Sequence, residues 1–204
     1  MFMRGLLYSE EYRPLFSGHE TFALRQLWLK KALDIATLDR SRDPLYTDKK
    51  SGGDRPIKKN VFSADQAIVT LGVGKNMVGS IKHWASACDV LSDVNGTPKP
   101  TEFGAKIFGE EGLDPYSEHP ATLWLVHWKL AGGWCISEQR THRSTTWFWV
   151  FNHIHEQTFN MKGLLKQLEE YALQRSGEIS DVTLKRDVEV CLRCYVDRSE
   201  NASI

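Results

Sequence analysis

The chain has 204 residues, which is enough for one large domain or two small ones. Its hydrophobic content of 41% and charged content of 25% are ordinary for a soluble globular protein. A formal net charge of +0 excludes a polycationic protein that coats DNA with its whole surface. There is no apolar run of roughly 18 residues and no signal-peptide pattern, so we expect no membrane span and a cytoplasmic location.

The N-terminal third begins with an irregular arm over residues 1–15. Ser17 and Glu20 then have the spacing of a capping box, which predicts a helix over residues 16–37. His19 and Glu20 could instead be an acid/base pair. Adjacent helical residues do not face each other, so the capping interpretation is favoured.

A basic segment follows. Residues 25–59 hold ten Lys or Arg against five Asp, a local excess of five positive charges. Residues 39–60 within it form a polar loop, unusually long for a compact domain. Such a segment suits phosphate binding, and it equally suits a solvated, mobile loop.

Residues 65–91 have the pattern of a short helix, a glycine turn and a longer helix over residues 77–91 that Asn76 can cap. The turn is no phosphate-binding P-loop, because Val69 stands where that motif needs glycine and Asn76 where it needs Ser or Thr. Asn95-Gly96 predicts a hairpin over residues 92–100, and residues 101–108 a short capped helix. This order is typical of a winged helix-turn-helix, whose second helix enters a DNA groove.

The longer helix has two faces. An apolar stripe at helical spacing, which includes Val78, Ile81 and Trp84, predicts a side that packs on the core. The other side is small, polar or basic, as in a helix that approaches phosphates and base edges. With the lysine of the hairpin, the predicted DNA-binding residues are Lys75, Asn76, Ser80, Lys82, His83 and Lys99.

The second half predicts four further segments. Residues 114–131 form a helix in which Ser117 is the cap, Pro120 lies in the first turn, and Gly132-Gly133 ends it. Residues 145–154, dense in aromatic and β-branched side chains, fit a strand or a buried helix. Asn160 caps a helix to about residue 173, and Ser180 one to about residue 196. The predicted fold is mainly α, a winged helix-turn-helix followed by a helical, aromatic-rich region, with domains 1–113 and 114–204.

Two groups of residues raise the question of a metal site. Cys191 and Cys194 have zinc-ligand spacing, but no second pair accompanies them. His153-x-His155, with His142 nearby, has no carboxylate cluster at diagnostic spacing. We therefore expect buried free thiols, no metal, no cofactor and no catalytic residue.

Several motifs resemble one bacterial family. They are Phe16-Ser-Gly-His-Glu-Thr-Phe22, Leu71-Gly-Val-Gly-Lys-Asn-Met-Val78, Ser80-Ile-Lys-His-Trp84, Thr101-Glu-Phe-Gly104, the run from Asp114-Pro-Tyr116 to His119-Pro-Ala-Thr-Leu-Trp124, and Asp187-Val-Glu-Val-Cys-Leu-Arg-Cys-Tyr-Val196. They are similar to the domain of unknown function numbered four thousand and seven. Its members tend to lie beside phosphoadenosine-phosphosulfate-reductase-like proteins in DNA sulfur-modification and phage-defence loci. They also continue past the last of these helices, so the resemblance implies a shortened member or a fragment.

Three hypotheses follow. The first is a non-enzymatic DNA-binding or adaptor subunit of a DNA-modification (phosphorothioation-type) or antiphage defence system, with duplex DNA, other proteins of the system and a second copy as possible partners. The second is a protein-interaction subunit without DNA binding of its own, which the neutral charge favours because non-specific DNA affinity is electrostatic. The third is an enzyme such as a nuclease, for which the sequence offers no carboxylate or histidine cluster at metal spacing.

Overall fold

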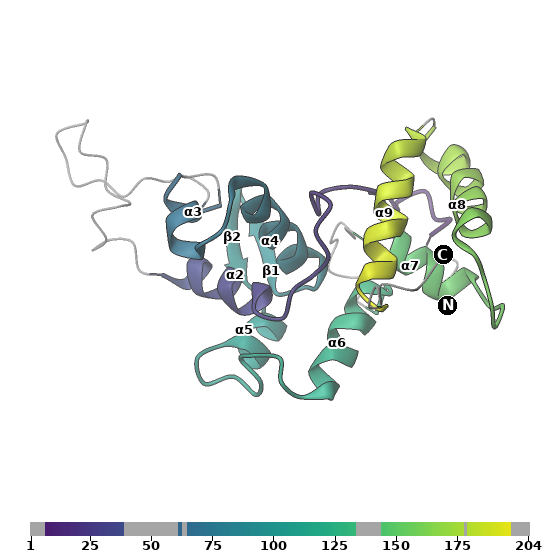
Figure 1. Ribbon diagram of the computed structural model, residues 1–204. Coiled ribbons are helices and arrows are strands. Elements are labelled where there is room, and N and C mark those ends of the chain that lie inside the picture. The colour runs from purple at the N-terminus through teal and green to yellow at the C-terminus, as the bar shows by residue number, and fades with distance from the viewer. Residues whose placement is uncertain (1–6, 39–60, 63–64, 134–143, 178, 197–204) are drawn as a thin grey trace. The chain divides into compact units, whose positions relative to one another are not determined.

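The computed structural model describes residues 7–38, 61–62, 65–133, 144–177 and 179–196 (Figure 1). This part of the chain is mainly helical, with one two-stranded sheet, as the sequence predicts. It divides into two compact units: Arg25–Leu123, here called the hairpin unit, and Met1–Leu24 with Trp124–Ile204, here called the arm unit. None of the described helices is long and apolar enough to cross a membrane.

The hairpin unit packs its other helices and a small hairpin around α2. α2 lies against α3, α4, α5 and β2, and α4 also contacts β1. Trp84, Ile81 and Phe108 are fully buried at this centre. The elements are α2 (Trp28–Thr37), α3 (Asp65–Leu71), α4 (Lys75–Ala87), β1 (Leu91–Val94), β2 (Thr97–Pro100) and α5 (Glu102–Phe108).

The hairpin confirms the prediction from Asn95-Gly96. β1 and β2 are antiparallel, with Leu91 opposite Pro100 and Val94 opposite Thr97. Asn95 and Gly96 have φ values of 55° and 79°, the positive values that a type I′ turn requires. The sequence pair therefore determines both the turn and the register of the strands.

Thr101 and Gly104, at the start of α5, lie close to the backbone of Val90, three residues after the end of α4. The Thr101 side chain accepts a hydrogen bond from the Gly104 N–H at 2.8 Å, so the predicted cap is confirmed. The Thr101 N–H donates to the Val90 carbonyl at 3.1 Å. A Cβ atom on Gly104 would lie 2.2 Å from that same carbonyl oxygen. Only glycine fits this close approach of the two backbones.

We expect Gly104→Ala to lower the free energy of unfolding by about 1–3 kcal/mol, because the added methyl group overpacks rigid backbone. Gly163, at the equivalent third position of α8, is the matched control, since its nearest contact would be an ordinary 3.4 Å. Gly163→Ala is expected to be neutral or stabilising by up to about 1 kcal/mol. Urea unfolding of both variants measures this, and equal losses would contradict the account.

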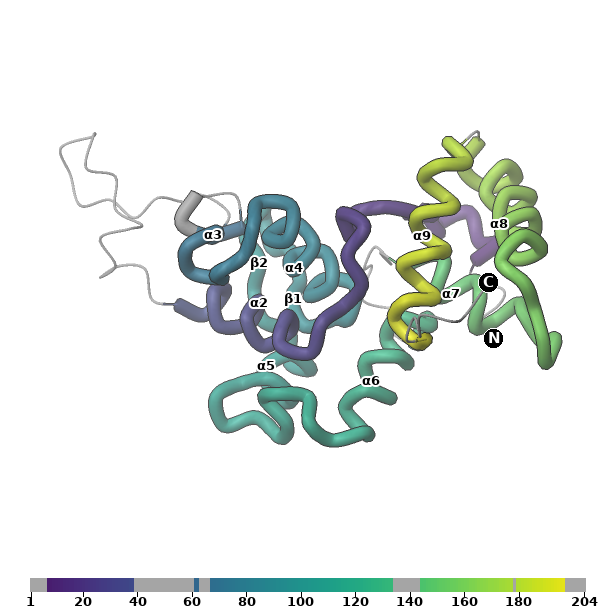
Figure 2. The backbone as a smooth tube through the Cα atoms, viewed as in Figure 1, coloured from purple at the N-terminus to yellow at the C-terminus, as the bar shows by residue number. Residues whose placement is uncertain are grey.

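The arm unit contains α6 (Pro120–Leu130), which begins in the hairpin unit, α7 (Thr145–His153), α8 (Met161–Ser176) and α9 (Asp181–Arg193). α9 packs against α7 and α8. The N-terminal arm runs past α8 and α9 (Figure 2). Its buried apolar residues, Leu7, Tyr12 and Phe16, share one core with Phe148, Leu168 and Leu184. The two units meet at residues 24 and 123 because the arm packs with α7, α8 and α9.

The predicted starts of α2, α4 and α6 differ from the structure, and α6 begins at Pro120 instead of residue 114. α2 begins at Trp28 instead of residue 16, and residues 16–21 form a loop in which Glu20 and Thr21 have left-handed φ values of 49° and 68°. These values are incompatible with a helix. α4 begins at Lys75 with Gly74 as its N-cap, so Asn76 lies inside the first turn and does not cap it.

The second half also refines the predicted caps. Residues 145–153 are a helix, which settles the alternative that the sequence left open. Asn160 caps α8 as predicted, accepting from the Gly163 N–H at 2.8 Å, whereas Ser180 occupies the N-cap of α9 without a side-chain bond. Ser117 does not cap α6; its φ is 55°, and the His119 ring accepts from the Ala121 N–H instead.

The turn before α6 is stabilised by Asp114. Its carboxylate accepts hydrogen bonds from the backbone N–H groups of Glu118 and His119, at 2.9 and 3.0 Å. Hydrogen bonds to the charged form, first from Thr122 and then from Glu118, lower the pKa of Asp114. Asp114 therefore stabilises the turn before α6, where the sequence analysis predicts Ser117 as the stabilising residue.

Candidate functional site

The exposed surface of α4 is a narrow stripe. Lys75 and Gly79 are exposed, and Lys82 and Ser86 are half-buried. Their spacings of four, three and four residues place them on one side of the helix. Lys75 and Lys82 are therefore two turns apart, about 10 Å along the helix axis. α4 contains no acidic residue, so this stripe is purely basic and polar.

Two of the predicted DNA-binding residues are not on this stripe. Ser80 is 0% exposed and His83 is 7% exposed, and the His83 ring packs edge-on against Trp84 at 5.2 Å. The prediction that they face solvent is wrong, because α2, α3 and β1 all pack on α4 and leave a narrower open face than a helix lying on one core would have. The periodicity of apolar residues predicts which side of a helix is buried. It does not predict how many neighbouring elements pack on that helix.

The N-terminus of α4 is also open. Gly74 makes no side-chain cap, and Lys75 and Asn76, both exposed, occupy the first two helical positions. The first N–H groups of a helix have no partner within it and carry the positive end of the helix dipole. An uncapped end of this kind, next to a lysine, attracts an anion.

Lys99, the remaining predicted contact, is exposed on β2 opposite Ser92. It belongs to the same unit as the α4 stripe, and β1 connects its strand to α4 through direct packing. The basic loop over residues 39–60 lies outside the described residues, so its predicted phosphate contacts have no structural counterpart here.

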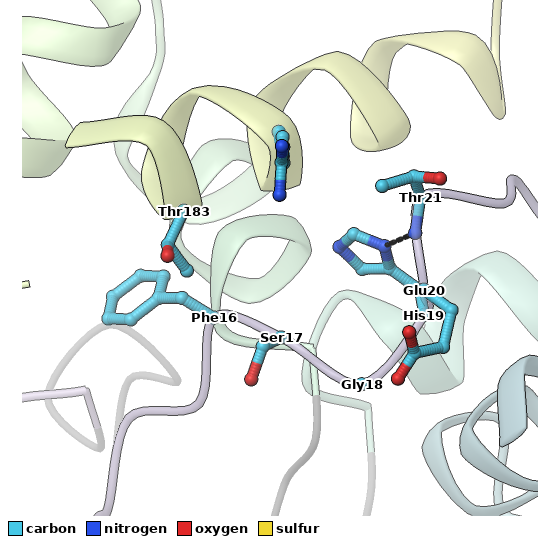
Figure 3. Close-up of a pocket in the computed structure, with 8 residues that line it drawn as sticks. Phe16, Ser17, Gly18, His19, Glu20, Thr21 and Thr183 are labelled. Atoms are coloured by element: carbon cyan, nitrogen blue, oxygen red, sulfur yellow. Dashed lines mark hydrogen bonds between the residues drawn. The ribbon is translucent and has the colours of Figure 1, made fainter. Parts of the chain in front are cut away.

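A second feature, in the arm unit, was not predicted. Residues 16–21, here called the motif loop, lie beside α9 (Figure 3), and a buried histidine holds them there. His19 is 4% exposed, and its Nε2 lies 2.6 Å from Asp187 Oδ1. The other Asp187 oxygen accepts from the hydroxyl of Thr146 on α7. The loop is thereby joined to two helices through buried polar groups.

The tautomer of His19 follows from its partners. The Thr21 N–H donates to Nδ1 at 3.1 Å, and a backbone N–H can only donate. Nδ1 therefore carries no proton, and Nε2 donates its proton to Asp187. Both ring nitrogens are occupied and the ring is buried, so His19 fixes the position of the loop. The helical interpretation missed this, since its partner lies 168 residues away.

Cys191 is buried, and Cys194 and His153 are partly buried. Burial raises the pKa of the Cys194 thiol to about 11 and that of Cys191 well above its ordinary value. His153 stacks on Trp149 at 5.1 Å. Over the described ranges, no three His, Cys, Asp or Glu side chains gather where they could hold a metal ion. Cys135 and His142 lie outside those ranges.

An aromatic cluster surrounds His127 on α6. The His127 ring lies 4.5 Å from Phe151, 5.6 Å from Tyr195 and 5.7 Å from Trp124, and its Nδ1 is 2.9 Å from the Tyr195 hydroxyl. Partial burial lowers the pKa of His127. Trp124 is 70% exposed and Trp128 50% exposed, so this helix presents large apolar side chains to solvent.

Comparison with known proteins gives the family. The family model described as "Protein of unknown function (DUF4007)" matches residues 16–204, and the chain belongs to this family, as its motifs predict. No curated protein matches the chain. The chain is similar to a structure described as "Magnesium ion-bound SspB crystal structure", with a TM-score of 0.71, 24% identity, and coverage of 94% of this chain and 52% of that one.

A second structure, "SspB crystal structure", is similar with a TM-score of 0.68 and 24% identity over 92% of this chain and 51% of that one. The chain thus spans about half the length of the structures it matches. At this identity the likeness shows a shared fold. The magnesium ion belongs to that protein.

Proposed function

We propose that this chain, a member of the DUF4007 family, is a DNA-binding or adaptor subunit of a bacterial DNA-modification system of the phosphorothioation type, or of an antiphage defence system. In this proposal α3, α4, the hairpin and α5 form a winged helix whose α4 contacts duplex DNA. The α4 stripe carries the proposal, because it combines two aligned lysines with an uncapped helix start and no carboxylate.

The geometry suits contact with the DNA backbone. Lys75 and the free N–H groups at the start of α4 would meet one phosphate, and Lys82, two turns further along, would meet another. Gly79 between them leaves room for close approach, as it has no side chain. Lys99 on the hairpin would add a third phosphate contact, in the position of a wing. Asn76 is the remaining exposed side chain that could reach a base edge.

The cellular context of the proposal rests on the resemblance. Family members tend to lie beside phosphoadenosine-phosphosulfate-reductase-like proteins in DNA sulfur-modification and phage-defence loci, and proteins of such loci act on DNA. A non-enzymatic role agrees with the His19 geometry, in which both ring nitrogens are already bonded.

The alternative is a protein-interaction subunit without DNA binding of its own. The exposed aromatic side chains of α6 favour it, since apolar side chains gathered on a surface often mark protein contacts. The net charge of +0 also removes any general attraction to DNA.

The salt dependence of duplex binding separates the two. Three phosphate contacts predict that the logarithm of the association constant falls with the logarithm of salt concentration with a slope of about −2.7, or about 40-fold between 50 and 200 mM salt. Fluorescence anisotropy with a labelled duplex measures this slope. Absence of binding at the lower salt concentration would favour the protein-interaction subunit.

A further inference from the structure

The motif loop and α9 enclose a shallow pocket of about 170 Å³. Its wall consists of residues 16–21 on one side and of Thr183 and Arg186 on the other (Figure 3). All of these residues belong to the arm unit. The pocket is distinct from the α4 stripe, which lies in the hairpin unit.

The loop wall has a fixed and unusual shape. Gly18, Glu20 and Thr21 have φ values of 112°, 49° and 68°, and left-handed conformations at non-glycine residues are unfavourable. One buried and one exposed hydrogen bond hold this shape: His19 bonds Asp187, and the Arg193 guanidinium donates to the Thr21 carbonyl at 2.6 Å. A wall held in this way is preorganised for a ligand.

The side chains that α9 contributes to the pocket determine which class of ligand it can bind. Thr183 and Arg186 are three residues apart, on one face of α9 near its start. Among the described residues, no ion pair engages Arg186. A guanidinium and a hydroxyl group that line one pocket are suited to an oxyanion, which accepts charge-assisted hydrogen bonds from both. The Glu20 carboxylate lines the pocket too, but it lies beside Gly18, away from Thr183 (Figure 3).

The size restricts the ligand. Pockets for drug-sized molecules typically have volumes of about 300–1,000 Å³, which this pocket does not reach. A pocket of this size can hold one tetrahedral oxyanion with part of its hydration.

We propose that this pocket binds a single phosphate-class oxyanion, with the Arg186 guanidinium as its main contact and the Thr183 hydroxyl as a second donor. The oxyanion can be free inorganic phosphate or one phosphodiester of a DNA backbone. In the second case the inference deepens the proposed function by adding a contact independent of α4. The binding chemistry is the same in both cases.

Isothermal titration of the full chain with inorganic phosphate, at constant ionic strength with chloride, tests the site. Arg186→Gln is expected to weaken phosphate binding at least tenfold. Lys185→Gln is the matched control, because it removes the neighbouring exposed charge of α9 outside the pocket, and it should change affinity less than twofold. Glu20→Gln should strengthen binding, as it removes a carboxylate from the wall.

Two results would overturn the proposal: equal affinities of the Arg186→Gln and Lys185→Gln variants for phosphate, or no phosphate binding to the unaltered chain. A titration with a short duplex then identifies the source. A loss of duplex affinity in Arg186→Gln, and competition by phosphate, support a backbone phosphodiester. If phosphate binds, but Arg186→Gln keeps its duplex affinity and phosphate does not compete with the duplex, the ligand is a free anion. If Lys75→Glu leaves phosphate binding unchanged, the proposed phosphate site holds independently of whether α4 binds DNA.

Discussion

Replacement of Asp187 by alanine is expected to lower the free energy of unfolding by about 2–5 kcal/mol. Asp187 is 2% exposed and accepts hydrogen bonds from His19 and Thr146. Its loss leaves both buried donors without acceptors, at about 1–3 kcal/mol each. The motif loop should also lose its shape, since His19 no longer has a fixed orientation to accept from Thr21. Hydrogen exchange should report faster exchange in residues 16–21 and in α7 and α9.

Asparagine provides the conservative comparison. Asp187→Asn keeps one carbonyl oxygen for His19, and the Thr146 hydroxyl can turn to accept from the new amide. We therefore expect a loss of about 1 kcal/mol. Asp181→Ala, an exposed change in the first turn of α9, controls for the helix dipole and should cost less than about 1 kcal/mol. If Asp187→Ala lowers the free energy of unfolding no more than Asp187→Asn does, the hydrogen bonds of Asp187 do not hold the motif loop.

Replacement of Trp84 by alanine is expected to cost about 3–5 kcal/mol, because it leaves a large cavity at the centre of the hairpin unit. Trp84 is 0% exposed, on the side of α4 opposite the α4 stripe. Hydrogen exchange should show lost protection in α2 and α4, whereas α8 and α9 of the arm unit should change little, since the two units have separate cores.

Trp124 is the control for this change. It is 70% exposed, so Trp124→Ala removes the same side chain from a mainly hydrated site. We expect a loss of about 0.5 kcal/mol, as for other surface substitutions. Similar losses at positions 84 and 124, measured by urea unfolding, would contradict the assignment of Trp84 to the core.

Local chemistry explains why part of the fold was predictable. The Asn95-Gly96 turn, the Thr101 cap and the Asn160 cap each depend on neighbours within three residues. The structure confirms all three. The buried stripe of α4 could also be predicted from the sequence, because Val78, Ile81 and Trp84 recur at helical spacing.

The remaining features depend on contacts distant in sequence. Ser17 and Glu20 have capping-box spacing, yet residues 16–21 form a loop because His19 bonds Asp187, 168 residues away. Ser80 and His83 look solvent-facing on a helical wheel, and packing on three sides buries them. The sequence offered one signal for the loop: a glycine and a histidine in a motif too polar for a helix that packs on a core.

The central claim is that α4 contacts duplex DNA, and charge reversal on its stripe tests it most directly. The Lys75→Glu, Lys82→Glu variant should bind a labelled duplex at least tenfold more weakly, with a salt slope smaller by about 2, since two phosphate contacts are lost. Lys162→Glu, Lys166→Glu, on the exposed side of α8, changes the net charge equally and should retain most of the affinity and the slope. Equal losses in both variants would contradict a DNA-contacting α4 and leave only a general charge effect.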